Sequence, residues 1–160
     1  KTAYEIRNCD WSSDVCSSDL GIRYGQRKQK GQSDTEQLVS VRNYLKRRWH
    51  LDFKREWYLG FTQEDRLTMI MECVPKGTQF KWKNPDLLYI GKFGMIIIEV
   101  DGAVHDRKVL DTWKRNELYI SNGIKLIVLN LANIKASGKT LFETLDCDLD
   151  RILGGLCAKH

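Results

Sequence analysis

Apolar positions first recur at helical spacing in residues 33–50, SDTEQLVSVRNYLKRRWH. The apolar residues of this stripe are Leu38, Val41, Leu45 and Trp49. Ser33, followed three residues later by Glu36, is typical of a capping box at the N-terminus of a helix. Because a period near 3.6 with one apolar face indicates an amphipathic helix, the pattern predicts a helix that packs this stripe against the core.

The next apolar runs have the composition of β-strands. Residues 53–59, FKREWYL, and residues 66–74, RLTMIMECV, are rich in aromatic and β-branched side chains, which strands favour. Residues 60–65 are expected to form the loop between them, and Pro75 and Gly77 to end the second run. The two segments therefore predict neighbouring strands of a meander.

Residues 85–102, PDLLYIGKFGMIIIEVDG, have the pattern of a β-hairpin with GKFG as its turn. If Gly91 pairs with Gly94, the register places Asp86 directly opposite Glu99. Cross-strand neighbours lie about 4.5–5.5 Å apart at Cβ, and like charges at such positions destabilise a sheet. Since a one-residue bulge at the turn would change this register, the pairing is a specific and testable prediction.

An acidic cluster is expected at the end of this hairpin. Glu99 and Asp101 are two residues apart on one strand and so point to the same face of the sheet. With Asp86 they form a group of like charges that a divalent cation would stabilise, because hard cations bind carboxylate oxygens. Read singly, Asp86 after a proline and Asp101 before Gly102 are also typical of turns. Two turns account poorly for the facing pair of Asp86 and Glu99.

The remainder of the chain predicts helix, strand and helix. Residues 106–123 are expected to form a helix that ends at Gly123 as its cap. Its core-facing residues are expected to be Val109, Trp113 and Ile120. Residues 124–131, IKLIVLNL, predict a buried strand, and residues 140–156 predict a closing helix. The order of helix, meander, helix, strand and helix indicates an α/β fold.

Residues 1–20, KTAYEIRNCDWSSDVCSSDL, resemble the translation of a sequencing-library adapter. We therefore expect this segment to be disordered or only incidentally packed, and we exclude it from the prediction of the fold. It holds two of the 26 basic and four of the 21 acidic residues, so the other 140 residues carry seven more basic than acidic groups. This excess favours a polyanionic partner. Residues 33–160 have the length of a single domain.

Cysteine usage and hydropathy limit the class of protein. Beyond the adapter-like segment, Cys73, Cys147 and Cys157 are far apart and odd in number, so no zinc or disulfide framework is expected. The interpretation is a protein of the reducing cytoplasm. No apolar run reaches the roughly 18 residues of a membrane span, so we expect no membrane partner.

Basic residues indicate where a nucleic acid would bind. Residues 21–32, GIRYGQRKQKGQ, predict a flexible basic arm, which either contacts DNA or is a disordered edge. Residues 76–84 alternate lysines with Phe80 and Trp82. This alternation suits nucleic acid, and a solvated strand edge is an equal alternative. The candidate contacts are Arg42, Lys46, Arg47, Lys81, Lys83 and Arg115.

The acidic motif resembles the PD-(D/E)XK nuclease superfamily. The similarity runs through Pro85, Asp86, Glu99 and Asp101. The pattern is more similar to the very-short-patch-repair-like branch, in which E-x-D-G-x-x-H precedes a helix with an arginine, a glycine and an apolar strand. Those features are here Glu99, Asp101, Gly102, His105, Arg115 and Gly123. The resemblance covers about residues 33–131, and Asp101 occupies the place of the lysine of the superfamily, which leaves the identity of the base open.

The resemblance implies a restriction-endonuclease-like core, with a central mixed sheet of four to five strands flanked by helices in the order α-β-β-β-α-β. It implies a DNA endonuclease that hydrolyses phosphodiester bonds with Mg²⁺ or Mn²⁺. The expected catalytic residues are Asp86, Glu99, Asp101, His105 and Glu36. Asp86, Glu99 and the Val100 carbonyl would hold the metal, with Asp101 as a further ligand or as the group that orients water.

Two other functions remain open from the sequence. One is a nucleic-acid-binding module that keeps the fold and performs no chemistry. The other is a nuclease subunit that is active only within a larger transposition or restriction complex, or as a homodimer. For His105 a structural role weighs about as much as proton transfer, and for Arg115 a surface ion pair weighs more than a phosphate contact.

Overall fold

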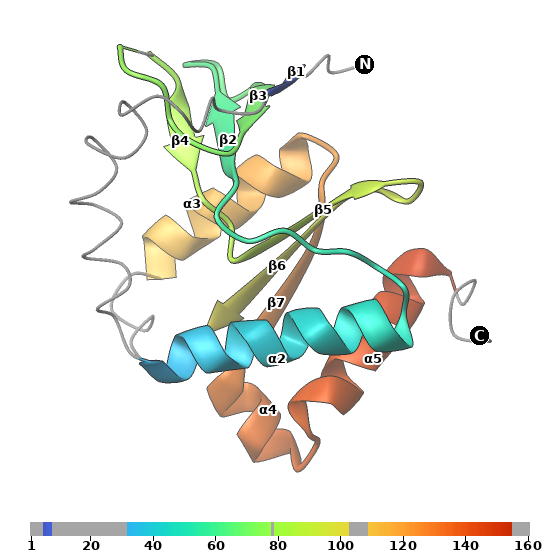
Figure 1. Ribbon diagram of the computed structural model, residues 1–160. Helices are drawn as coiled ribbons and strands as arrows, with labels where there is room; N and C mark the ends of the chain where they lie inside the picture. Colours follow the sequence, from blue (N-terminus) through green and yellow to red (C-terminus); the bar gives the residue numbers. More distant parts are fainter. Residues whose placement is uncertain (1–4, 8–31, 78, 103–108, 155–160) are drawn as a thin grey trace.

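The chain forms a mixed α/β structure (Figure 1). The computed structural model describes residues 5–7, 32–77, 79–102 and 109–154, with the backbone alone for 5–7 and 32–35. Its elements in chain order are β1 (Glu5–Arg7), α2 (Gln32–Arg48), β2 (Tyr58–Phe61), β3 (Leu67–Met71), β4 (Lys81–Lys83), β5 (Leu87–Gly91), β6 (Gly94–Asp101), α3 (Val109–Ser121), β7 (Lys125–Asn130), α4 (Leu131–Ser137) and α5 (Leu141–Leu153).

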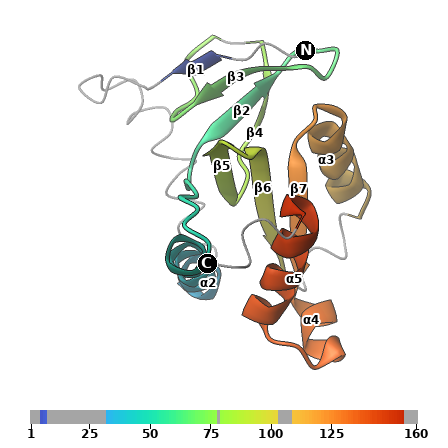
Figure 2. The ribbon, with the colours of Figure 1, turned by 90° about the vertical axis from the view of Figure 1, so that its right-hand side faces the viewer.

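The strands are divided between two sheets, and this differs from the expected single central sheet of four to five strands. One sheet has the order β1-β3-β2-β4, and the other has the order β5-β6-β7. Figure 2 shows the two sheets as separate groups of strands. A single bridge between Lys54 and Leu88 connects the segment before β2 to β5. Glu56 has a φ of 65°, and this left-handed backbone interrupts the run predicted as a strand over 53–59.

The hairpin of β5 and β6 has the predicted register. Gly91 pairs with Gly94, Ile90 with Met95, and Leu87 with Ile98, without a bulge at the turn. β6 also pairs in parallel with β7, the strand predicted over 124–131. The hairpin prediction is therefore confirmed, and β6 is the central strand of its sheet.

Side chains of the central strand alternate between two hydrophobic clusters. Ile96 and Ile98 belong to the first cluster, which α2 and α5 cover. Met95 and Ile97 belong to the second cluster, which contains residues of β2, β3 and α3. This period of two is that of a strand buried on both faces. The face of β6 that carries Glu99 is thus the face covered by α3 and the other sheet.

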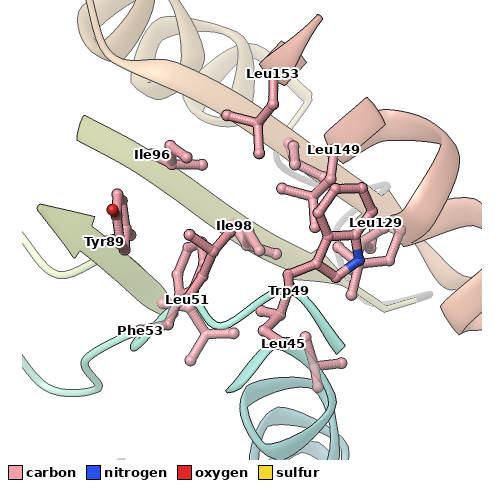
Figure 3. Close-up of a cluster of buried hydrophobic side chains, with 14 of the residues drawn as sticks. Leu45, Trp49, Leu51, Phe53, Tyr89, Ile96, Ile98, Leu129, Leu149 and Leu153 are labelled. Atoms are coloured by element: carbon pink, nitrogen blue, oxygen red, sulfur yellow. The ribbon is translucent and has the colours of Figure 1, made fainter. Parts of the chain in front are cut away.

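α2 packs with the predicted stripe inward. Val41, Leu45 and Trp49 are buried, and Leu38 packs against them. Figure 3 shows Trp49 among Leu45, Leu129 and Leu149. The helix begins at Gln32, so Ser33 lies within the helix and not at the expected N-cap position.

α3 presents a different face to the core from the one predicted. Val109, Trp113 and Ile120 are 67%, 59% and 55% exposed, so their assignment to the core is wrong. The buried residues of the helix are Leu118 and Tyr119. The prediction of a helix was correct, but the residues assigned to its buried face were not.

The C-terminus of α3 ends as predicted, at a glycine with a left-handed backbone. Gly123 has a φ of 75°. Its N–H donates to the Ile120 carbonyl at 3.0 Å, and the Ile124 N–H donates to the Tyr119 carbonyl at 3.2 Å. These two bonds form a Schellman motif, which turns the chain from α3 into β7.

The last two helices are defined by their caps. α4 was not expected from the sequence, and the Asn130 side chain accepts from the Asn133 N–H at its N-terminus. α5 begins with a capping box between Thr140 and Glu143 and ends at Gly154. The predicted closing helix over 140–156 is confirmed with these bounds. Both ends follow the usual preference for Thr at the N-cap and Gly beyond the C-terminus.

The adapter-like segment has one described element. Glu5–Arg7 form β1, which pairs in parallel with Met69 to Met71 of β3. At these three residues the structure differs from the expected disorder, while 1–4, 8–20 and the basic arm of 21–31 lie outside the described residues. Cys73 is disulfide-bonded, which differs from the expectation that no disulfide is formed.

Candidate active site

The hairpin brings Asp86 and Glu99 together at its open end, where Asp86 immediately precedes β5 and Glu99 lies within β6. Asp86 lies one residue before Leu87, whose pairing with Ile98 is the outermost of the hairpin. The Asp86 Oδ2 accepts the Val100 N–H at 2.9 Å. This bond uses an N–H of β6 at a point where β5 no longer pairs with it. Asp86 is thereby held against β6 beside the Glu99 carboxylate, so the predicted proximity of these two acids is confirmed.

Glu99 and Asp101 lie on one face of β6, as their spacing predicts. They are 3% and 5% exposed and are the buried charged residues of the described chain. The Arg115 guanidinium of α3 contacts both carboxylates. Its Nε is 3.8 Å from Glu99 Oε1, and its Nη2 is 3.7 Å from Asp101 Oδ1. The acids therefore face a partly buried cation that comes from the following helix.

The environment of Glu99 disfavours its charged form. Burial first, and then the negative charge of Asp86, raises the pKa of Glu99 to about 8. Arg115 acts in the opposite direction and offsets only part of the increase. A carboxyl group with such a pKa in a cluster of acids is characteristic of functional sites, although structural ion pairs produce the same effect.

Tyr119 contacts the same carboxyl group from α3. Its hydroxyl donates to Glu99 Oε1 at 3.4 Å, and its ring is fully buried. Burial, followed by the charge of Glu99, raises the pKa of Tyr119 above its usual range. The tyrosine is therefore a neutral hydrogen-bond donor at neutral pH.

Asn116 holds the arginine of the cluster. Its Oδ1 accepts from Arg115 Nε at 3.3 Å and from Arg115 Nη2 at 3.1 Å. The same two guanidinium nitrogens, Nε and Nη2, therefore face both the Asn116 amide oxygen and the carboxyl groups of Glu99 and Asp101. Since the carboxylates are farther from it than a direct hydrogen bond allows, the arginine is positioned near the acids without saturating them.

The donor chemistry of the cluster fits a hard divalent cation. Asp86, Glu99 and Asp101 supply carboxylate oxygens, which Mg²⁺ and Mn²⁺ prefer. The negative charge of Asp86 raises the pKa of Glu99, and a cation between them would favour the ionised form of Glu99. Within the described residues, however, no group of three or more His, Cys, Asp or Glu has an arrangement that could hold a metal ion. Asp86 and Glu99 are the candidate protein ligands, and the roles of Asp101 and of the Val100 carbonyl stay predictions.

Two residues predicted to act in catalysis are not placed at this cluster. Glu36 is exposed on α2, and the contacts described above for the three acids do not involve it. His105 lies outside the described residues. Their roles stay predictions from the resemblance.

The basic residues predicted to contact DNA come from three different parts of the structure. Arg115 lies in the acid cluster. Lys46 and Arg47 belong to the last turn of α2, which lies on the opposite side of the molecule from the end of β6 (Figure 1). Lys81 of β4 contacts Asp65 at 2.8 Å, and Lys83 is half-buried.

Lys46 and Arg42, two of the predicted DNA contacts, lie near the acidic side chain of Asp52. A hydrogen bond from Lys54 is the main cause that lowers the pKa of Asp52, and the positive charges of Lys46 and Arg42 add to the effect. Arg42 itself is half-buried on α2. The structure therefore does not gather the predicted contacts into one described surface.

Sequence reasoning missed Asn116 and Tyr119. Both flank residues already considered: Asn116 follows Arg115, and Tyr119 lies four positions after it on the same helical face. Asn116 is adjacent to the arginine, so helical spacing gave no signal for it. For Tyr119 the spacing of four residues from the arginine was the available signal, since residues i and i+4 share one side of a helix. The incorrect phase of the helix concealed it.

Comparisons of the chain with protein-family models, with curated proteins and with solved structures give no match. None of the helices in the described part of the chain combines the length and the apolar character that crossing a bilayer requires.

Proposed function

We propose that this chain is a metal-dependent nuclease that hydrolyses phosphodiester bonds in DNA. The observation that supports the proposal is the close approach of Asp86 and Glu99 at the end of a rigid hairpin. Burial and the charge of Asp86 favour the protonated form of Glu99, because a buried charge costs free energy unless it is paired or coordinates a metal. A cation bound between the two carboxyl groups would remove this cost in the ionised state, so the pair is well suited to a divalent metal.

The residues of the cluster divide into two roles. Asp86 and Glu99 would bind Mg²⁺ or Mn²⁺, which lowers the pKa of bound water and stabilises charge on a phosphate. Asp101 orients water, or supplies a further ligand, from the same face of β6. Arg115 offers a guanidinium whose geometry suits phosphate oxygens, and it already lies beside the acids.

A plasmid-nicking assay with Mg²⁺ or Mn²⁺ tests the proposal. The wild-type chain should convert supercoiled plasmid to the nicked or linear form, and chelation with EDTA should stop the reaction. Asp86→Asn and Glu99→Gln should each abolish cleavage. Asp65→Asn is the matched control, because the exposed Asp65 carboxylate pairs with Lys81 of β4 and does not belong to the acid cluster.

One observation favours a second candidate, a nucleic-acid-binding module without catalysis. Arg115 lies against Glu99 and Asp101 and can neutralise part of the cluster without any metal. In that case the wild-type chain would bind DNA in EDTA and leave it intact with either metal. The homodimer, the larger DNA-processing complex and the cytoplasmic location stay predictions from the sequence.

A further inference from the structure

Tyr119 is a fully buried residue of α3 whose hydroxyl contacts one of the acids, Glu99. Its ring is fully buried in the cluster formed by β2, β3, β5, β6 and α3. Phe61 of β2 contacts it with ring centroids 6.3 Å apart. A buried tyrosine hydroxyl usually has a hydrogen-bond partner, and the partner here is Glu99 Oε1 at 3.4 Å.

The helix that carries Tyr119 is fixed in place immediately after this residue. Asn122 accepts the Leu67 N–H at 2.8 Å and donates to the Asp65 carbonyl at 2.8 Å. Its amide also donates to the Leu118 carbonyl of α3 itself. These bonds attach the end of α3 to the turn between β2 and β3, so the Tyr119 hydroxyl has a defined position relative to β6.

We propose that Tyr119 is a positioning residue, whose hydroxyl holds the Glu99 carboxylate in the orientation required to bind a divalent cation. This inference rests on the proposed function. The hydroxyl engages Oε1, and a carboxylate has about four acceptor sites over its two oxygens, so capacity for a cation remains. Groups that orient a ligating carboxylate typically contribute about 10- to 100-fold in metal affinity or activity.

Tyr119→Phe tests the inference, because it removes the hydroxyl and keeps the buried ring. We expect Mn²⁺ affinity, measured by calorimetric titration, to fall about tenfold, at the lower end of that range since the bond is long. Tyr89→Phe is the matched control: Tyr89 is also buried, but it belongs to the first hydrophobic cluster, on the opposite face of the sheet. Its affinity should stay within twofold of the wild type.

The melting temperature gives an independent measurement if Tyr119→Phe is less stable. Because a ligand of the folded state raises stability according to its concentration relative to Kd, the Mn²⁺-induced rise in melting temperature should be smaller in this variant. Unchanged Mn²⁺ affinity and an unchanged rise, in a wild type that binds Mn²⁺, would overturn the inference alone. Absence of Mn²⁺ binding in the wild type would overturn the proposed function together with it.

Discussion

The Val100 N–H donates a 2.9 Å hydrogen bond to Asp86 Oδ2, and this bond places the acid of one strand beside the acid of the next. It continues the contact between the two strands past the last ladder pair, Leu87 and Ile98. The bond fixes the position of a charge whose negative field acts on Glu99. The first three of the following predictions depend on this arrangement.

Asp86→Asn and Glu99→Gln should each remove Mn²⁺ binding and leave the fold intact. Asp86→Asn deletes the negative charge beside Glu99, and Glu99→Gln replaces a largely protonated carboxyl group by a neutral amide. An asparagine oxygen can still accept the Val100 N–H. The metal-free variants should therefore unfold at the same urea concentration as the wild type, or a higher one. Calorimetric titration and urea unfolding measure the two effects, with Asp65→Asn as control. Wild-type Mn²⁺ affinity in both variants would refute the metal site.

The metal-free protein should lose stability as pH rises from about 5 to about 8. The folded-state pKa of Glu99 is raised from 4.5 to about 8, so the folded state binds more protons than the unfolded state in this interval. Linkage then requires the free energy of unfolding to fall with pH and to level off above the folded pKa. The stability of Glu99→Gln should depend less on pH, and melting temperatures measured between about pH 5 and pH 8 test the prediction.

Mn²⁺ binding should strengthen with pH over the same interval. Since metal ligands must be deprotonated, binding to Glu99 displaces its proton, and the affinity should rise about tenfold per pH unit below the pKa of about 8. Calorimetry in buffers of different ionisation enthalpy counts the released proton directly. An affinity that is constant between pH 6 and pH 8 would show that Glu99 does not bind the metal in its ionised form.

Arg115→Gln should destabilise the metal-free protein by about 2 kcal/mol, the scale of an interaction with a charged group that is left without its partner. The arginine is 19% exposed beside Glu99 and Asp101. Urea unfolding in EDTA measures the loss, and Mn²⁺ should reduce it by supplying another cation. Arg151→Gln is the control: its ion pair with Asp148 is 73% exposed on the arginine side and should change stability by less than about 0.5 kcal/mol.

Asn122→Ala should destabilise the protein by about 2–3 kcal/mol. The change leaves the Leu67 N–H without its acceptor and removes two further bonds of the amide, and each unsatisfied buried group costs about 1–3 kcal/mol. Thermal and urea unfolding measure the effect. Asn133→Ala, at an exposed position of α4, should change little; an equal loss in both variants would contradict the role given to Asn122.

DNA binding should weaken linearly in log affinity as log salt increases, by about 0.9 per phosphate contact on duplex DNA. Lys46→Gln and Arg47→Gln, at exposed positions of α2, should each reduce this slope by about one contact. Lys81→Gln should reduce it less, because Lys81 is already paired with Asp65. Fluorescence anisotropy at several salt concentrations measures the slopes, and an affinity independent of salt would exclude phosphate contacts.

The sequence by itself determined the hairpin and the proximity of its acids. Gly91 and Gly94 define a short turn, and the apolar run after it must alternate between two buried faces. A slip of one residue would move every side chain to the opposite face. Local geometry therefore sufficed to place Asp86 near Glu99, and to place Glu99 and Asp101 on one side of β6.

Only the tertiary structure decided which face of α3 is buried and how the strands divide into two sheets. The face of α3 toward the core carries Leu118 and Tyr119 together with Arg115 and Asn122, while Trp113 is exposed. A prediction of the buried face from apolar residues alone places polar side chains in solvent, because burying them without partners costs free energy. Here the partners are carboxylates of β6 and backbone groups of the β2–β3 turn, which come from other elements of the chain. That compensation arises only when the elements pack together, and so no pattern within α3 could reveal it.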